Sequence, residues 1–239
     1  MITSIHNACI KDVMKLKQKK YRNQTKQYLV EGHHLVQEAL QKDKVAYILS
    51  TEELQIHVKV ILVSEAVMKK LTDVMHPQTI MAVCHMDIDD TIIVGNRYLL
   101  LDTLQDPGNV GTLIRTAAAF GIDQVILSPT CVDIYNDKVL RAMQGAHFHI
   151  SCVYQDLMQC IPYLQQQGIF VVGSALQGAR AIETIEPSQR MAFVVGNEAN
   201  GMLEQHRKVC DALACIPIRD MESLNVAIAG SIMMYHFKK

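Results

Sequence analysis

The sequence predicts an α/β protein of two domains, the second of which holds a mostly parallel sheet. Strand-like apolar runs alternate with helix-like segments along the 239 residues, which is the pattern of βαβ units. In the second half the apolar runs are almost continuous, as expected for parallel strands covered on both faces. An acidic, turn-rich segment separates the halves. We therefore expect a small α/β domain over residues 1–86, a linker over 87–96 and a larger domain over 97–239.

The first domain is expected to begin with a basic, loosely amphipathic helix over residues 5–20. Strands are then expected at 28–32, 45–50, 59–64 and 78–86, and helices at 33–43 and 64–74. Ser64 is a candidate N-cap of the last helix, because its hydroxyl can accept a hydrogen bond from a free N–H of the first turn.

The larger domain is expected to hold five strands and five helices. The strands are expected at 97–104, 124–128, 169–175, 191–196 and 212–218, and the helices at about 109–120, 136–145, 156–167, 202–211 and 223–238. Gly121 follows the first of these helices, where glycine readily takes the left-handed conformation of a helix end.

Composition and charge narrow the class of protein. Hydrophobic residues make up 49% and charged residues 20%, as in ordinary globular proteins, and the formal net charge of −1 gives no sign of nucleic acid. The seven cysteines form no C-x-x-C pair, so we expect free thiols and no metal site. The chain start lacks the apolar segment of a signal peptide, and no apolar run is long enough to cross a membrane. We therefore expect a cytoplasmic protein.

The charge is nevertheless uneven along the chain. The first 30 residues carry a group of cations, namely Lys11, Lys15, Lys17, Lys19, Lys20, Arg22 and Lys26. Such a group can follow the phosphates of a nucleic acid. On charge alone a solvated helix face is the more common interpretation, and both stay open at this point.

The segment LDTLQDPGNVGTLIRTAAAFGI, residues 101–122, joins a strand to an alanine-rich helix through a Pro-Gly turn. It contains neither G-x-G-x-x-G nor G-x-x-x-x-G-K-[ST], which disfavours a nicotinamide-dependent Rossmann enzyme. Arg115 lies one turn after Gly111 on the same helix face, and a bare glycine lets a ligand approach closely. An arginine there suits an anionic or oxygen-rich substrate, although a structural role stays open.

Two further strand ends carry similar polar loops. FVVGNEANGM, residues 193–202, places Asn197 and Glu198 between two glycines, and IPIRDMESLNVAIAG, residues 216–230, places Ser223 and Asn225 at the start of the last helix. Glu198 could instead complement a helix dipole, and Ser223 could be only an N-cap. Asn225 is expected inside an apolar helix, where its amide needs partners. Because carboxyl ends of parallel strands meet at one edge, we expect the three loops to line one crevice.

Together the three segments resemble the motifs of the SpoU/TrmH family of RNA ribose 2′-O-methyltransferases, within the SPOUT superfamily. The matching stretches are DPGNVGTLIRTAAAFG, VVGNEANGM and IPIRDMESLNVAIA, and RAMQGAHFHI resembles the family's segment between the first two motifs. The amino-terminal half resembles the family's RNA substrate-binding domain, which is similar to ribosomal protein L30e. Two positions depart from the family: the loop 218–221 lacks its usual glycine, and Ala227 stands where serine is frequent.

The resemblance implies a trefoil-knotted carboxy-terminal domain with an S-adenosylmethionine site in the knot. It also implies a homodimer whose active sites draw residues from both subunits. By position, the catalytic residues would be Arg115, Asn109, Glu198, Ser223 and Asn225. The cofactor would touch Ser174, Gly196, Ile216, Ser223 and Leu224, and RNA would meet Lys15, Lys17, Lys19, Lys20, Arg22 and Arg141. No metal is implied.

The implied activity is methylation of a ribose 2′-hydroxyl in RNA, with ribosomal RNA favoured over transfer RNA. A non-catalytic RNA-binding or ribosome-associated protein is the alternative from another class, and the intact catalytic residues disfavour it. Because an arginine side chain is nearly always protonated, we expect Arg115 to stabilise the developing alkoxide and hold a phosphate. Its role as the base stays open, and Glu198 is a second candidate to receive the proton.

Overall fold

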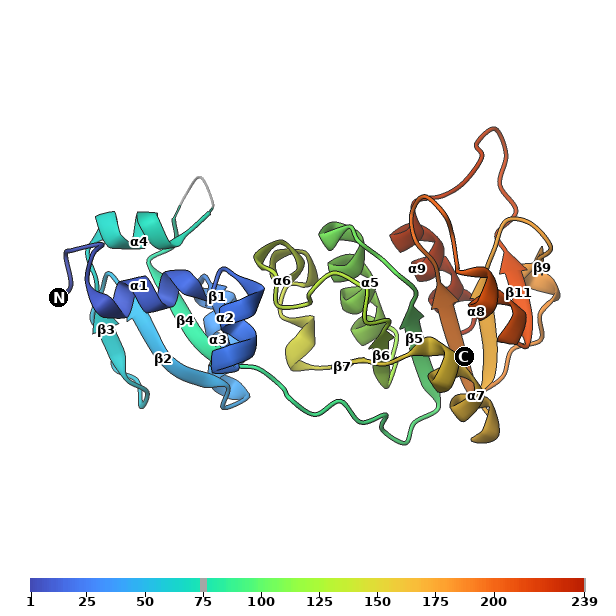
Figure 1. Ribbon diagram of the computed structural model, residues 1–239, viewed down its shortest axis with the longest axis horizontal. Coiled ribbons are helices and arrows are strands. Elements are labelled where there is room, and N and C mark those ends of the chain that lie inside the picture. The colour runs from blue at the N-terminus through green and yellow to red at the C-terminus, as the bar shows by residue number, and fades with distance from the viewer. Residues whose placement is uncertain (74–76, 239) are drawn as a thin grey trace. The chain divides into compact units, whose positions relative to one another are not determined.

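The computed structural model describes residues 1–73 and 77–238 (Figure 1), so the end of the helix predicted over 64–74 lies outside the described residues. The chain divides into two compact units. The first comprises Met1–Ile88 with Tyr135–Leu140, and the second comprises Asp89–Ile134 with Arg141–Lys239. Within the described ranges, no helix has the length and apolar character needed to cross a membrane.

The first unit is built on a four-stranded sheet. Its elements are α1 (Ala8–Lys15), α2 (Lys19–Thr25), β1 (Gln27–Glu31), α3 (His33–Gln41), β2 (Val45–Ser50), β3 (Val60–Leu62), α4 (Glu65–Leu71) and β4 (Ile80–His85). The sheet order is β1-β4-β2-β3, with β4 antiparallel to both its neighbours and β2 parallel to β3. Val13 of α1 and Leu71 of α4 share one apolar core with Leu49 and Val83. Helices α1 and α4 therefore cover the same face of this sheet.

The single helix predicted over residues 5–20 is wrong, because the chain forms two helices there. Helix α1 ends at Lys15 and α2 begins at Lys19. The side chain of Arg22 is only 4% exposed, and its Nη1 donates to the carbonyl oxygens of Leu16 (2.9 Å) and Lys17 (2.8 Å). These carbonyl groups lie just beyond α1, where the helix no longer supplies partners. Arg22 therefore fixes the corner between the two helices.

The second half of the chain contains a seven-stranded sheet. Its elements are β5 (Arg97–Leu101), α5 (Pro107–Ala119), β6 (Gln124–Leu127), α6 (Asp137–Met143), a 3₁₀ turn (Ala146–Phe148), β7 (Ser151–Tyr154), α7 (Leu157–Gln166), β8 (Phe170–Ser174), β9 (Arg180–Ala181), a second 3₁₀ turn (Ile182–Thr184), β10 (Met191–Val195), α8 (Glu204–Val209), β11 (Ala212–Cys215) and α9 (Val226–His236). The strand order is β7-β6-β5-β10-β8-β11-β9. Every pairing in it is parallel, which confirms the predicted mostly parallel sheet.

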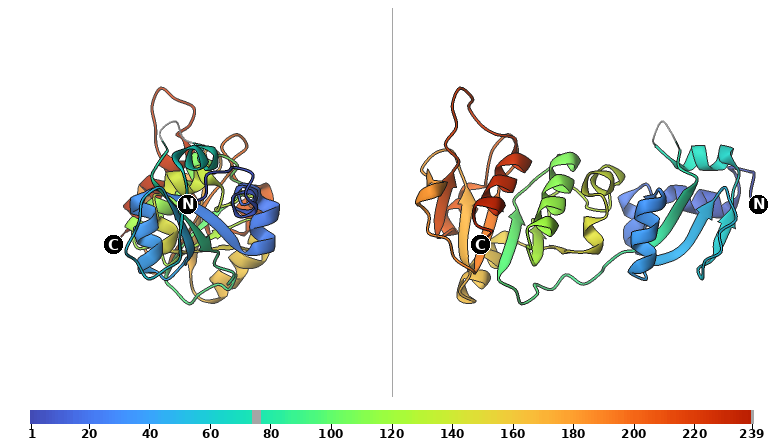
Figure 2. Two further views of the ribbon diagram at one scale, coloured as in Figure 1. Left: turned by 90° about the vertical axis from the view of Figure 1, so that its left-hand side faces the viewer. Right: turned by 180° about the vertical axis from the view of Figure 1, so that it is seen from behind.

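Helices cover both faces of this sheet. Val194 shares a core with Ile161 of α7, whereas the neighbouring residue Phe193 stacks on Phe237 at the end of α9, with 5.7 Å between ring centroids. Because successive strand residues point to opposite faces, α7 and α9 lie on opposite sides of β10. Helices α5 and α9 pack against each other (Figure 2).

The segment between the two halves is held by the larger unit. Gln124 is fully buried on β6, and its Nε2 donates to the Thr91 carbonyl (2.9 Å) while its Oε1 accepts from the Ile93 N–H (3.2 Å). The hydroxyl of Tyr98 donates to the Ile93 carbonyl at 2.8 Å. Residues 89–96 thus belong to the second unit as an ordered segment.

Two helix ends follow the predicted capping chemistry. The Oγ of Ser64 accepts a hydrogen bond from the Val67 N–H (3.3 Å), which confirms Ser64 as the N-cap of α4. Gly121 has a φ of +69° just after α5, as predicted for the residue that ends this helix.

The chain makes a tight turn directly after β10. The backbones of Asn197 and Gly201 exchange two hydrogen bonds of 2.9 Å, and this closes the turn against the end of the strand. A Cβ atom added at Gly196 would lie 2.0 Å from the backbone nitrogen of Met202 and 2.2 Å from the carbonyl carbon of Gly201. Only glycine fits at position 196, because backbone atoms of the returning chain fill the side-chain position.

We expect Gly196→Ala to lower the free energy of unfolding by about 3 kcal/mol, because the turn must shift to admit the methyl group. The matched control is Gly121→Ala, since nothing lies within 4 Å of a Cβ there and only the positive φ opposes it. The control should cost about 1 kcal/mol. Urea unfolding of both variants measures the difference, and equal losses would contradict this view of the turn.

Candidate active site

A pocket of about 150 Å³ lies at the carboxyl ends of β8, β10 and β11. It has space for a ligand of many atoms, since a water molecule needs only about 10–15 Å³ on the same measure. All five residues expected to touch the cofactor line it, namely Ser174, Gly196, Ile216, Ser223 and Leu224. The sequence missed others from the same segments, including Leu176, Cys215 and Ile218, and also Met233 of α9. The second and third polar segments therefore meet at this pocket as predicted, whereas none of the residues that line it belongs to the first segment, 101–122.

The lining of this pocket fits S-adenosylmethionine. Ile216, Ile218 and Leu224 provide apolar walls of the kind that a purine ring needs. Among the described residues, no group accepts a hydrogen bond from the backbone N–H groups of residues 218–224. Of these residues, Ile218, Ser223 and Leu224 line the pocket, so their N–H groups are free to bind the polar edge of a nucleoside.

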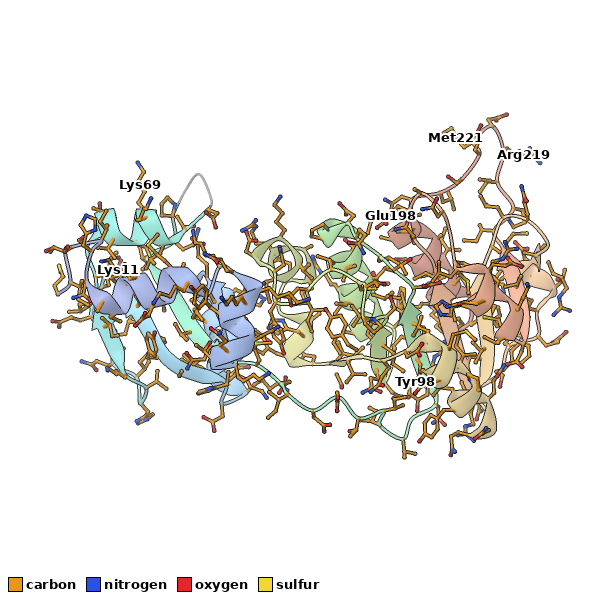
Figure 3. All side chains as sticks on the ribbon, in the orientation of Figure 1. Lys11, Lys69, Tyr98, Glu198, Arg219 and Met221 are labelled. Atoms are coloured by element: carbon orange, nitrogen blue, oxygen red, sulfur yellow. The ribbon has the colours of Figure 1, made fainter. Side chains whose placement is uncertain are left out.

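The loop 217–224, which lacks the family's usual glycine, contains one residue in the left-handed conformation. Asp220 has a φ of +62°, and aspartate is one of the few residues besides glycine that tolerate this conformation. The loop carries Arg219 and Met221 outward, away from the sheet (Figure 3). Met221 is 72% exposed.

The carboxamide of Asn109 joins the three polar segments. Its Nδ2 donates to Oε1 of Glu198 (3.1 Å), and its Oδ1 accepts from Nδ2 of Asn225 (3.0 Å). These contacts span 89 and 116 residues of sequence. Three of the five predicted catalytic residues therefore form one hydrogen-bonded cluster. One of them, Glu198, lines the pocket together with its neighbour Asn197.

The amino terminus of α5 holds this cluster in place. Asp106 is the N-cap, and its Oδ1 accepts from the Asn109 N–H at 2.8 Å. The backbone N–H of Asp106 in turn donates to Oε1 of Glu198 (3.3 Å). A carboxylate is stabilised there by free N–H groups and by the helix dipole. Glu198 thus complements a helix dipole, as the alternative interpretation allowed. The helix is α5, which lies about 90 residues earlier in the chain. Asp106 was not predicted, although Asp before Pro107 is a helix-start signal.

The third segment differs from its prediction in where the helix starts. Asn225 is the N-cap of α9, and its Oδ1 accepts from the N–H groups of Ala227 (2.9 Å) and Ile228 (3.3 Å). The predictions that Ser223 begins the helix and that Asn225 lies inside it are therefore wrong. An asparagine cap satisfies orphan N–H groups and still leaves its Nδ2 to reach Asn109. Ser223 instead lies exposed in the loop that lines the pocket.

Arg115 lies outside the cluster. It is exposed on α5, and its side chain makes no hydrogen bond or ion pair with any residue that the structure describes. It follows Asn109 by six residues, which at about 100° per residue places the two side chains on different sides of the helix. The guanidinium is therefore available to a substrate or to another chain.

The cations expected to meet RNA differ in their surroundings. Lys15 pairs with Asp12 (2.8 Å) and Lys17 with Asp73 (2.9 Å). Lys19 and Lys20 are exposed, and neither pairs with a carboxylate of the described chain. Arg141 is half-buried on α6.

Arg22 corrects the prediction for this group. Its guanidinium is buried against the end of α1, so it is not offered to RNA. Charge and spacing alone do not separate Arg22 from the lysines, because its burial depends on how two short helices meet.

The thiols are free, as predicted. Burial raises the pKa of Cys84, Cys160 and Cys210 to about 12, so these thiols stay protonated at neutral pH. Within the described part of the chain, no three His, Cys, Asp or Glu side chains are grouped so that they could hold a metal ion.

Comparisons with known proteins agree with this geometry. The SpoU rRNA Methylase family profile matches residues 96–235, and the MRM3-like substrate binding domain profile matches residues 7–82. The first match covers all three polar segments.

Relatives and solved structures extend the match over the whole chain. The 23S rRNA (guanosine(2553)-2′-O)-methyltransferase RlmP of Bacillus subtilis is 38% identical, and the alignment covers 99% of this chain and 98% of that protein. The 23S rRNA (guanosine-2′-O-)-methyltransferase RlmB of Coxiella burnetii is 31% identical over 76% of this chain and 77% of its own. The AdoMet-bound rRNA methyltransferase of Sinorhizobium meliloti is 30% identical, with a TM-score of 0.90 over 99% of this chain and 96% of its own. The chain belongs to the SpoU rRNA methylase family.

Proposed function

We propose that this chain transfers the methyl group of S-adenosylmethionine to a ribose 2′-hydroxyl of ribosomal RNA. The meeting of Asn109, Glu198 and Asn225 beside the pocket is the observation that carries the proposal. The Bacillus subtilis relative, which matches almost end to end, is named for guanosine 2553 of 23S rRNA. We therefore take a guanosine ribose at the corresponding place in 23S rRNA as the substrate, and the cytoplasm as the place of reaction.

Residues of this chain orient the ribose 2′-hydroxyl and accept the proton that it loses. The cofactor supplies a methyl group on a sulfonium centre that is already electrophilic. Asn109 is fixed by Glu198 and Asn225, so this cluster offers a preorganised set of polar groups for the ribose. Glu198 receives the proton that the hydroxyl loses, and the positive charge of Arg115 stabilises the developing alkoxide and holds the neighbouring phosphate.

We extend the proposal to a homodimer whose active sites use residues from both copies. Helix α9 presents an apolar row to solvent, with Ile228 51%, Ile232 37% and Tyr235 57% exposed. Their spacing of four and three residues puts them on one face of the helix. A second copy that covers this face would come close to the exposed Arg115 on the adjacent helix α5.

The first unit is proposed to grip the RNA through its cations. Residues 1–88 hold 12 Lys and Arg against nine Asp and Glu, whereas residues 89–239 hold 11 against 15. The net charge of −1 therefore combines a basic part and an acidic part, and the basic part suits contacts with phosphates.

Labelled methyl transfer tests the proposal and its rivals. The protein is incubated with labelled S-adenosylmethionine and either 23S rRNA or transfer RNA from cells that lack the modification. Label on one 23S rRNA ribose is expected, and label on transfer RNA alone would favour the other substrate. A thermal shift with S-adenosylmethionine addresses the non-catalytic alternative, because a protein without a working cofactor site should not be stabilised by it.

We expect Arg115→Ala to bind S-adenosylmethionine normally and to lose methyl transfer by about 100-fold to 1,000-fold, the usual cost of removing one transition-state stabiliser. Arg190→Ala is the matched control. Arg190 is also an exposed arginine, but it directly precedes β10, whereas the pocket lies at the carboxyl end of that strand. Single-turnover transfer rates measure the loss. A wild-type rate for Arg115→Ala would remove both roles assigned to this residue.

We expect Lys19→Gln with Lys20→Gln to weaken RNA binding and to lower the slope of log Kd against log salt concentration by about 1 to 2, because two phosphate contacts are lost. The control removes Lys42 and Lys59, two exposed lysines elsewhere in the same unit. Binding titrations at several salt concentrations give the slopes. Equal slopes for the two double variants would mean that Lys19 and Lys20 belong to a solvated helix face and make no contact with RNA.

A further inference from the structure

The exit of β5 holds a buried carboxylate that the proposed chemistry does not use. Asp102 follows β5 directly and has no exposed surface. Its Oδ2 accepts from the Leu203 N–H at 2.8 Å, and it lies 2.8 Å from Nδ1 of His206, which is 4% exposed. We propose that Asp102 is a positioning residue for methyl transfer, which holds the loop 197–203 so that Glu198 stays on Asn109. This inference rests on the proposed function.

Two successive residues of one strand end hold both ends of that loop. The carbonyl of Thr103 accepts from Nδ2 of Asn197 at 3.0 Å, and Asp102 binds the N–H of Leu203 at the other end. Thr103 has a φ of +61°, which is an unusual conformation for a β-branched residue, and its N–H donates to Oγ of Ser128 at 2.9 Å. Such strain persists where surrounding contacts impose it, and it is common at functional sites.

The loop between these anchors carries Glu198. Oε1 of Glu198 accepts from Asn109 and from the Asp106 N–H, while Oε2 accepts from Nδ2 of Asn197 at 3.3 Å. Asn197 therefore links Glu198 to Thr103. If the Leu203 end of the loop comes free, the carboxylate loses the fixed geometry that proton transfer requires.

The carboxylate of Asp102 has few partners in its buried position. Oδ1 of Asp102 has no hydrogen-bond partner among the described residues. Oδ2 also lies 2.8 Å from Nδ1 of His206, although the two atoms do not meet the geometry of a hydrogen bond. A buried carboxylate with so few donors is stable only while its partners stay in place. This ties the start of α8, and with it the loop, firmly to β5.

Asp102→Asn tests the proposal, because the amide keeps the size of the side chain and can still accept one N–H while losing the charge. The control is Asp211→Asn. Asp211 also accepts a hydrogen bond from a backbone N–H, that of Val171 at 2.8 Å. It precedes β11, however, and so lies at the amino ends of the parallel strands, away from the carboxyl ends where Asp102 lies. Methyl-transfer kinetics and amide hydrogen exchange of residues 197–203 are measured for the full-length wild type and both variants.

We expect Asp102→Asn to lower kcat at least tenfold, to change KM for RNA less than threefold, and to speed exchange of the Leu203 amide at least tenfold. Asp211→Asn should change none of these. Wild-type kcat in Asp102→Asn, or an equal loss in both variants, would overturn the proposal. Hydrogen exchange needs neither cofactor nor RNA, so it decides whether Asp102 holds the loop even if the wild type transfers no methyl group, a result that would defeat the proposed function alone.

Discussion

The carboxamide of Asn109 is the contact on which the arrangement of the site depends. It donates to Glu198 and accepts from Asn225 at the same time, which neither a carboxylate nor an apolar side chain of that size can do. The contact exists only because β5, β10 and β11 run parallel and end at the same edge of the sheet. The geometry of the site therefore requires both the parallel direction of these strands and the caps of the helices that follow them.

The larger features of the fold and site could be predicted because they follow from repeated patterns. Continuous apolar runs identified β5, β6, β8, β10 and β11. The resemblance to the SpoU/TrmH motifs pointed to Ser174, Gly196 and Leu224, which line one pocket. Strands β7 and β9 were missed because they lie at the two edges of the sheet, where burial is incomplete or the strand has only two residues. The trefoil knot stays a prediction, since strand order and pairing do not by themselves define how a chain is threaded.

The remaining differences concern single side chains whose partners are set by tertiary structure. In the sequence Arg22 resembles one more surface cation, but its side chain is buried and donates to two nearby carbonyl groups. Asn225 reads as a helix-interior residue, yet it caps α9. Asp102 gave no signal at all, because its significance comes from Leu203 and His206, a hundred residues further along the chain. Local patterns predict elements and their ends; they do not predict which distant group an isolated polar side chain will meet.

Gln124 and Tyr98 share hydrogen bonds with the segment before β5, and these bonds affect how such enzymes can diversify. Because residues 89–96 are already built into the larger unit, the chain ahead of Asp89 can be exchanged without rebuilding the sheet. If the first unit grips the RNA, as we propose, a different module joined there would inherit an intact methyl-transfer half, provided that it also accommodates Tyr135–Leu140, which cluster with the first unit. Recombination at this single joint would then redirect the same chemistry to a new RNA.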